Sequence, residues 1–220
     1  MQSFQAFASI GVVAVSDRRR DAGARTKQRL LDATLELLAE RGEDGVTLRD
    51  ITTAADANVA SVSYHFGSLG ALCCATAKQA ITRLLDEQLA RLQALDADAT
   101  VDDVARAIAH PIIAALSDPG SPDRELLRIF DRTLSAPEGE MRDWIKASLA
   151  RVDAELMSRL GQALPDVSEA ELRFRWDCVA GILRGLVAGS ARTDLDGCCP
   201  EDLERMLVPV LAGALAAPRV

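Results

Sequence analysis

The sequence predicts an all-α protein with a short N-terminal unit followed by a longer helical part. Three observations indicate this. Apolar residues recur at steps of three and four through most of the 220 residues, which is the period of a helix with one buried face. Residues that begin helices, such as Ser, Thr, Asn and Pro, precede many of these runs. After Leu72 the sequence has no alternating apolar and polar run bounded by turns, so nothing there indicates a strand.

The N-terminal unit begins with a helix predicted over residues 26–41. Its apolar residues fall on one face, which predicts an amphipathic helix covering a small core; they are Leu30, Ala33, Leu37 and Leu38. Gly42 follows and is expected to end the helix.

Two short helices are predicted next. Thr47 and Asp50 have the spacing of a capping box, which opens a helix whose inner face holds Leu48, Ile51 and Ala55. After a tight turn, Asn58 is expected to cap another helix over residues 59–65. A supporting helix and two short helices in this order are typical of a helix-turn-helix, whose last helix enters the DNA major groove.

The side chains of residues 59–65 divide into two groups. Val59 and Val62 are expected to pack inward, which leaves small, polar and aromatic side chains facing DNA. With the capping residues and two upstream cations, the candidate DNA-binding residues are Arg25, Lys27, Thr47, Asn58, Val59, Ala60, Ser61, Ser63, Tyr64 and His65.

This segment resembles the TetR family of bacterial transcription regulators. Residues 55–68 read ADANVASVSYHFGS, similar to the family pattern A-G-V-N-x-A-x-[IV]-x-Y-H-F-G-S-K, and the upstream segments AERG and TLRDI are similar to its first two helices. Asp56, Ala57 and Leu69 depart from that pattern. Asp tolerates the positive φ that the turn requires. Leu69 replaces a lysine that neutralises a phosphate in the family, so we expect weaker backbone affinity and a salt dependence smaller by about one unit.

Charge is distributed unevenly along the chain. The net charge is −8, but residues 1–80 are neutral overall and residues 81–220 carry all of it. Residues 18–29 hold six cations and one acid, which predicts a basic arm suited to the DNA backbone or minor groove, or else a solvated leader. We therefore divide the chain into a flexible extension (1–25), a helix-turn-helix DNA-binding domain (26–72) and a helical ligand-binding and dimerisation domain (73–220).

Six further helices are predicted beyond the helix-turn-helix. Thr100 with Asp103, Ser121 with Pro122, Ser168 with Glu171, and two prolines mark their starts. The predicted ranges are 69–95, 101–116 with a bend near Pro111, a helix from 122, 137–164, 168–191 and 200–216.

Three glycines recur at steps of four in the predicted helix 168–191. Gly181, Gly185 and Gly189 share one stripe, and each costs about 1 kcal/mol relative to alanine, so close approach of another helix is expected to offset the loss. That helix belongs either to a second copy or to the same chain. The TetR resemblance places the last two helices in a homodimer interface, and two recognition helices related by a two-fold axis would read a palindromic double-stranded DNA operator.

The resemblance also implies a pocket for a small-molecule effector, with release from the operator when it binds. Aromatic residues are scarce, and several cluster between residues 130 and 176. The candidate lining residues are Phe130, Met141, Trp144, Phe174 and Trp176, each of which could instead belong to the core, with Arg128, Arg132 or Arg175 as anion partners. The segment ELRFRWDCVAGIL resembles members that respond to fatty acyl compounds.

Other classes of function find little support in the sequence. It has no nucleophile elbow, phosphate-binding loop, dinucleotide fingerprint or zinc-protease motif, so we expect no catalytic residue, metal or cofactor. Its five cysteines are expected to be free thiols, with Cys74 or Cys178 buried. No signal peptide or spanning segment is evident, which predicts a cytoplasmic protein. One alternative remains, a DNA-binding adaptor whose C-terminal helices bind a partner protein.

Overall fold

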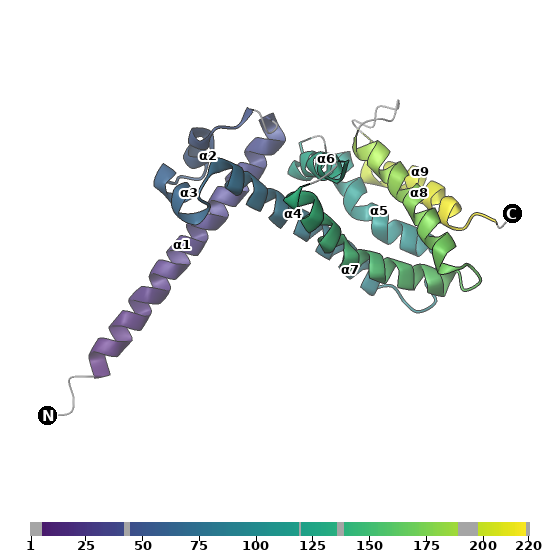
Figure 1. Cartoon of the computed structure of the whole chain (residues 1–220), viewed down its shortest axis with the longest axis horizontal. Helices are drawn as coiled ribbons and strands as arrows, with labels where there is room; N and C mark the ends of the chain where they lie inside the picture. The colour runs from purple at the N-terminus through teal and green to yellow at the C-terminus, as the bar shows by residue number, and fades with distance from the viewer. Residues whose placement is uncertain (1–5, 42–44, 119, 136–138, 189–197, 219–220) are drawn as a thin grey trace. The chain divides into compact units, whose positions relative to one another are not determined.

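The computed structural model describes residues 6–41, 45–118, 120–135, 139–188 and 198–218, without the side chains of residues 6–20, 129 and 132–135. Over these residues the predicted all-α fold is confirmed, since every regular element is a helix (Figure 1). The helices are α1 (Ala6–Arg41), α2 (Leu48–Ala54), α3 (Val59–His65), α4 (Leu69–Gln93), α5 (Val101–Ser117), α6 (Pro122–Ser135), α7 (Glu140–Ala163), α8 (Glu169–Val187) and α9 (Pro200–Leu215).

The chain forms two compact units. Residues 1–76 make the first unit and residues 77–220 the second, so the boundary falls within α4. The sequence predicts the corresponding division at residue 72, near the start of the same helix.

The first helix is longer than the sequence indicated. We expected it to begin at residue 26 behind a flexible extension, whereas α1 begins at Ala6 and continues without interruption to Arg41. No proline lies in this stretch, and its alanines and arginines favour helix, so nothing in the backbone stops the helix before residue 26.

The core of the first unit lies where α1, α2, α3 and the start of α4 meet. Leu30 and Ile51 are fully buried, and Val62 from α3 is 1% exposed. Leu72 from α4 completes the same cluster, together with Leu37 and Leu38. The predicted inner faces of the first two helices are therefore confirmed. These contacts fix the orientation of α3 on the unit, because a seven-residue helix has too little stability of its own.

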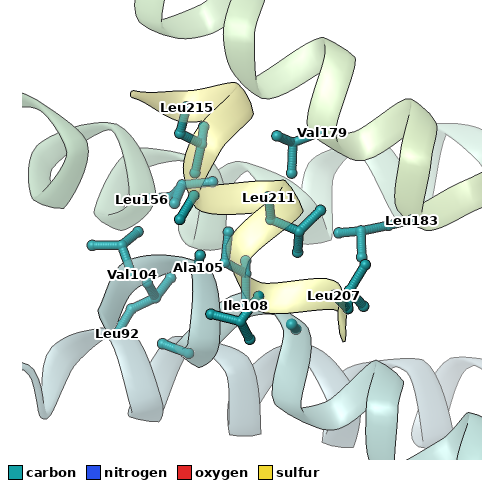
Figure 2. Packing of buried hydrophobic residues seen from close by; sticks show 14 of the residues in the cluster. Leu92, Val104, Ala105, Ile108, Leu156, Val179, Leu183, Leu207, Leu211 and Leu215 are labelled. Carbon is teal, nitrogen blue, oxygen red and sulfur yellow. The ribbon is translucent and has the colours of Figure 1, made fainter. Parts of the chain in front are cut away.

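The core of the second unit is built around α9 and α5. Figure 2 shows Leu211 of α9 lying between α5, which supplies Ala105 and Ile108, and α8, which supplies Val179 and Leu183. Leu211 and Ile108 are fully buried. α4 and α7 add Leu92 and Leu156 at the edge of this cluster. Leucine, isoleucine and valine dominate it, which accounts for the helical spacing of these residues in the sequence.

Most predicted helix boundaries in the second unit match the structure. The capping box of Thr100 and Asp103 opens α5, which runs through Pro111. Ser121 Oγ accepts a hydrogen bond from the Asp123 N–H at the start of α6. α7 begins at Glu140, and its predicted start at Pro137 lies outside the described residues. α8 ends at Val187 rather than at residue 191.

Two further expectations concern the cysteines and the membrane. None of the five cysteines is joined in a disulfide. The prediction that Cys74 or Cys178 is buried is wrong, because Cys178 is exposed on α8 and Cys74 is half-buried. None of the described helices has the length and hydropathy needed to cross a bilayer.

Candidate functional site

The start of α2 is fixed by a reciprocal pair of hydrogen bonds between Thr47 and Asp50. The Asp50 N–H donates to Thr47 Oγ1 (3.2 Å), and the Thr47 N–H donates to Asp50 Oδ2 (3.1 Å), which confirms the predicted capping box. The hydrogen bonds from the Thr47 hydroxyl and backbone, with a smaller effect of Arg41, hold the pKa of the Asp50 carboxyl below its usual range. Two otherwise unpaired N–H groups of α2 are satisfied in this way.

The chain then reverses over three residues. Asp56 has φ of 44°, the left-handed conformation for which a glycine was expected. The Ala57 N–H donates to the Thr52 carbonyl oxygen (2.9 Å), and Asn58 Oδ1 accepts from the Ala60 N–H (2.9 Å), so α3 begins where the sequence predicted. Aspartate thus fills the glycine position of the turn without disturbing either helix.

One face of α3 is buried and the opposite face is open. Val62 lies in the core, whereas the Tyr64 side chain is 84% exposed. Ala60 and Ser63 are also exposed, and Ser61 and His65 are half-buried. The expectation that Val59 packs inward is wrong: it is 47% exposed, because it precedes Val62 by three residues at the first turn, beyond the edge of the small core.

One cationic residue of α1, Lys27, lies beside the end of α3. A Cβ atom on Gly23 would be 3.8 Å from His65 Cε1, and Lys27 Nζ lies 5.8 Å from the centre of the Phe66 ring. Arg25 and Lys27 are exposed. The side chains of Arg18, Arg19 and Arg20 lie outside the described residues. α1 thus brings one of the predicted cations, Lys27, next to the end of α3, whereas Arg25 is exposed on the same helix.

Sequence reasoning missed two features of this surface. The approach of α1 to α3 at Gly23 was not foreseen, although a glycine opposite an aromatic side chain is a usable signal of close packing. Arg29 was counted with the basic arm, yet its Nη1 lies 3.7 Å from Asp56 Oδ2. Arg29 therefore forms an ion pair with the turn residue Asp56.

Leu69 takes a structural role at the family's lysine position. It opens α4 and packs, partly buried, against the core of the first unit. An apolar contact there replaces a cation that could have reached a phosphate.

Leu69→Lys should therefore steepen the salt dependence of DNA binding by about one unit per subunit, because each added phosphate contact releases about one counterion. Operator titrations between low and moderate salt measure this slope. Leu69→Gln is the control, since it loses the same apolar packing without adding charge. Equal slopes for the two variants would contradict a phosphate near this position.

A second candidate site lies inside the second unit. A cavity of about 220 Å³ opens between α4, α5, α6, α7 and α8. Its walls are mostly aliphatic and aromatic side chains, with a few polar groups among them. They are Ile81, Leu84, Leu85, Gln88, Pro111, Ile112, Leu127, Phe130, Asp131, Leu149, Asp153, Trp176, Ala180, Leu183, Arg184 and Val187. This composition is typical of a site for a small apolar ligand.

The structure brings only two of the predicted pocket aromatics together. Phe130 and Trp176 line the cavity. Met141 and Trp144 do not, and the Trp144 ring lies 5.5 Å from Lys78 Nζ instead. Phe174 is 68% exposed, because it stands on the face of α8 opposite the core.

Two of the arginines proposed as anion partners, Arg128 and Arg175, do not line the cavity. The buried Arg175 donates from Nη1 to the Leu215 carbonyl oxygen and from Nη2 to Glu171 Oε1, both at 2.6 Å, and so ties α8 to the end of α9. Arg128 pairs with Glu125 at 3.5 Å. The side chain of Arg132 lies outside the described residues.

The charged groups that do line the cavity were not foreseen. Arg184 Nε donates to Asp131 Oδ1 at 2.6 Å. Burial raises the pKa of the Asp153 carboxyl, and the exposed Asp177 adds to the rise; Arg173 and a hydrogen bond from the Trp176 indole oppose it. These residues are separated in sequence by as many as 53 positions, so no local pattern indicates that they converge.

The predicted glycine stripe of α8 faces away from the core. Cβ atoms on Gly181 and Gly185 would meet nothing within 4 Å, so within the described residues no other helix of this chain approaches them. Gly189 lies outside the described residues. Exposed apolar side chains share the outer faces of α8 and α9: Phe174 on α8, and Met206 and Val210 on α9. The alternative of a tight crossing within the chain is not supported at Gly181 and Gly185.

Comparisons with known proteins agree with this arrangement. The family of bacterial regulatory proteins, tetR family, matches residues 30–73, and the family described as tetracyclin repressor-like, C-terminal domain, matches residues 106–214. An uncharacterized HTH-type transcriptional regulator in the dhlA 5' region of Xanthobacter autotrophicus is 41% identical over 58 residues. That match spans 26% of this chain and only 29% of the relative's length.

Solved structures match over nearly their whole length. A TetR-family transcriptional regulator from Streptomyces coelicolor has a TM-score of 0.64 at 18% identity, covering 87% of this chain and 95% of its own. FadR from Bacillus subtilis, in complex with stearoyl-CoA, has a TM-score of 0.63 at 15% identity, covering 85% and 98%. The fatty acid degradation regulator FadR from Bacillus halodurans has a TM-score of 0.62 at 17% identity, covering 87% and 99%. At these identities the likeness concerns the fold.

A helix-turn-helix unit followed by a larger helical unit defines a class of DNA-binding transcription regulators. Both parts of one family match in their expected order. The chain belongs to the TetR family of transcriptional regulators.

Proposed function

We propose that the protein is a ligand-responsive repressor, which binds a palindromic operator as a homodimer and is released when a small apolar or acyl-type molecule occupies the cavity. The observation that carries this proposal is the double role of α4. Its first residues supply Leu72 to the core that holds α3, and its later residues supply Ile81 and Leu84 to the cavity wall. A ligand that shifts α4 can therefore alter how α3 is presented.

The DNA-binding part of the proposal rests on the open face of α3. Tyr64 and Ser63 are exposed there, with Arg25 and Lys27 on the adjoining helix. Exposed polar side chains can reach base edges, and cations beside them can reach phosphates, so the surface supports both sequence readout and backbone positioning.

The dimer rests on the outer faces of α8 and α9. Gly181 and Gly185 leave room for close approach, and Phe174, Met206 and Val210 expose apolar surface there. Two copies related by a two-fold axis would bury these side chains and place two α3 helices on one side of a duplex, about 34–36 Å apart.

The ligand part rests on the cavity. Its aliphatic and aromatic walls favour an apolar molecule. The printed description of the Bacillus subtilis FadR structure names stearoyl-CoA as its ligand. That likeness supports an acyl-type ligand as one form of the proposal.

Titration of inverted repeats from the DNA flanking the coding region tests this function. We expect one repeat to be bound in preference to a scrambled duplex, with an affinity that falls steeply with salt. A thermal-shift screen should then find one chemical class that raises the melting temperature and lowers operator affinity. Stabilisation by no class, together with a co-purifying protein, would favour the adaptor instead.

A further inference from the structure

The cavity of the second unit has a distinctive set of charges. Its walls are largely apolar, yet two carboxylates, Asp131 and Asp153, line it together with a single guanidinium among the described residues, that of Arg184. With both acids ionised these three side chains sum to −1, which disfavours an anionic guest.

The one cation of this lining is already engaged. Arg184 Nε donates to Asp131 Oδ1 at 2.6 Å, and the two side chains come from α8 and α6. An incoming carboxylate or phosphate would have to compete with Asp131 for this guanidinium. It would also be held near a second acid, Asp153, and like charges at short range repel.

Asp153 is the polar group of the lining that can accept further hydrogen bonds from a guest. It stands on α7 among lining residues such as Leu149 and Trp176, near enough to the Trp176 indole for that donor to lower the pKa of its carboxyl. A carboxylate offers two oxygens and about four acceptor sites, so one indole donor leaves most of them for a guest. Burial raises the pKa of this carboxyl, and a bound cation would reverse that effect by supplying the opposite charge.

We propose that the cavity takes an apolar molecule ending in a protonated amine, whose N–H groups bind the Asp153 carboxylate while its body lies against Phe130, Trp176 and the aliphatic wall. The proposal rests on the ligand-responsive function above and names the chemical class of its ligand: an apolar amine in preference to an acyl compound that carries negative charge. The aromatic rings add to the selectivity, because a cation close to a ring face is attracted to it.

Isothermal calorimetry with matched probes tests this. The probes are 3-phenylpropylamine, 3-phenylpropanol and 3-phenylpropionate, with octylamine, octanol and octanoate as a second skeleton. On each skeleton we expect the amine to bind at least about tenfold more tightly than the alcohol, since hydrogen bonds to charged groups contribute more than neutral ones. The carboxylate should bind most weakly.

Two single substitutions separate a direct role of Asp153 in binding the amine from the effect of removing one negative charge from the protein. Asp153→Asn should weaken amine binding at least about tenfold and leave alcohol binding nearly unchanged. Asp177→Asn is the matched control: it removes the same charge from the exposed face of α8, does not line the cavity, and should preserve the amine preference. Asp131→Asn should improve carboxylate binding, because it removes the negative charge that competes with a guest for Arg184. Thermal melts of each variant verify folding.

Two results would overturn the ligand class: amines that bind no more tightly than carboxylates on both skeletons, including no measurable binding by either, or amine binding unaffected by Asp153→Asn. The calorimetry is done without DNA, so its result does not depend on whether the protein regulates transcription. Amines that bind through Asp153 without changing operator affinity would leave the ligand class standing and refute the sensor function. Operator binding together with no amine binding in calorimetry would refute the ligand class and leave the regulatory function standing.

Discussion

Gly185→Leu should convert the protein from a dimer to a monomer and reduce operator affinity by at least about 100-fold, the scale of avidity lost when two linked half-sites are read separately. Among the described residues a Cβ atom at Gly185 has nothing within 4 Å, so there the chain itself leaves room for a side chain to begin at this position. Leucine also favours helix over glycine by up to about 1 kcal/mol. Any loss of assembly must therefore come from a second copy. Sedimentation velocity across a concentration series measures it.

Gly161→Leu provides the control for this prediction. Gly161 also lies two residues before the last residue of its helix, α7, and a Cβ atom there meets nothing within 4 Å. The Gly161→Leu variant gains the same helix propensity, but position 161 lies on α7, outside the proposed dimer interface of α8 and α9. We expect it to remain dimeric and to bind DNA as the unmodified protein does. A Gly185→Leu protein that stays dimeric with unchanged operator affinity would refute the α8–α9 interface.

Tyr64→Ala should weaken operator binding by about 1–3 kcal/mol per dimer, or roughly 5- to 150-fold, since each of two subunits loses one hydrogen bond or its equivalent. The side chain is 84% exposed, so its loss should leave the melting temperature nearly unchanged. Fluorescence anisotropy on the inverted repeat and on a scrambled duplex measures the effect. We expect the loss on both duplexes, because a long aromatic side chain at the edge of α3 is suited to the DNA backbone.

Two comparisons sharpen this result. Tyr64→Phe keeps the ring and removes the hydroxyl, so it separates a hydrogen bond from packing. Ser63→Ala should relax discrimination between operator and scrambled duplex if that side chain reaches a base edge. Binding of Tyr64→Ala and Ser63→Ala with unchanged affinity and unchanged discrimination would show that α3 is not the reading helix.

The sequence predicted the helical elements well because their signals are local. The capping boxes at Thr47 and Thr100, and the prolines that open α6 and α9, each act within one helical turn. The start of α1 was placed too late, because a cluster of like charges was read as an extension while the propensity of its residues favours helix. Local sequence rules predict that a helix exists more reliably than they predict the residue at which it begins or ends.

The two candidate sites differ in the same way, because one is formed by a single short segment and the other by several distant helices. The division of α3 into a buried and an open face was foreseen, since seven consecutive residues define it, although Val59 is exposed and Ser61 and His65 are half-buried. The cavity lining was not, because α4, α5, α6, α7 and α8 all contribute to it. Aromatic composition indicated Phe130 and Trp176, which line the cavity, but also Trp144 and Phe174, which face elsewhere. No sequence spacing relates Asp131 to Arg184 or places Asp153 beside Trp176.

Hydroxyl-radical footprinting of the unmodified protein on its inverted repeat is the most direct measurement of whether α3 is presented twice to one duplex. We predict two protected patches on one face of the DNA, centred about one helical turn or 34–36 Å apart, and loss of both in Gly185→Leu under the same conditions. A single protected patch, or two patches that persist when the protein is monomeric, would contradict a dimeric regulator that reads DNA through α3.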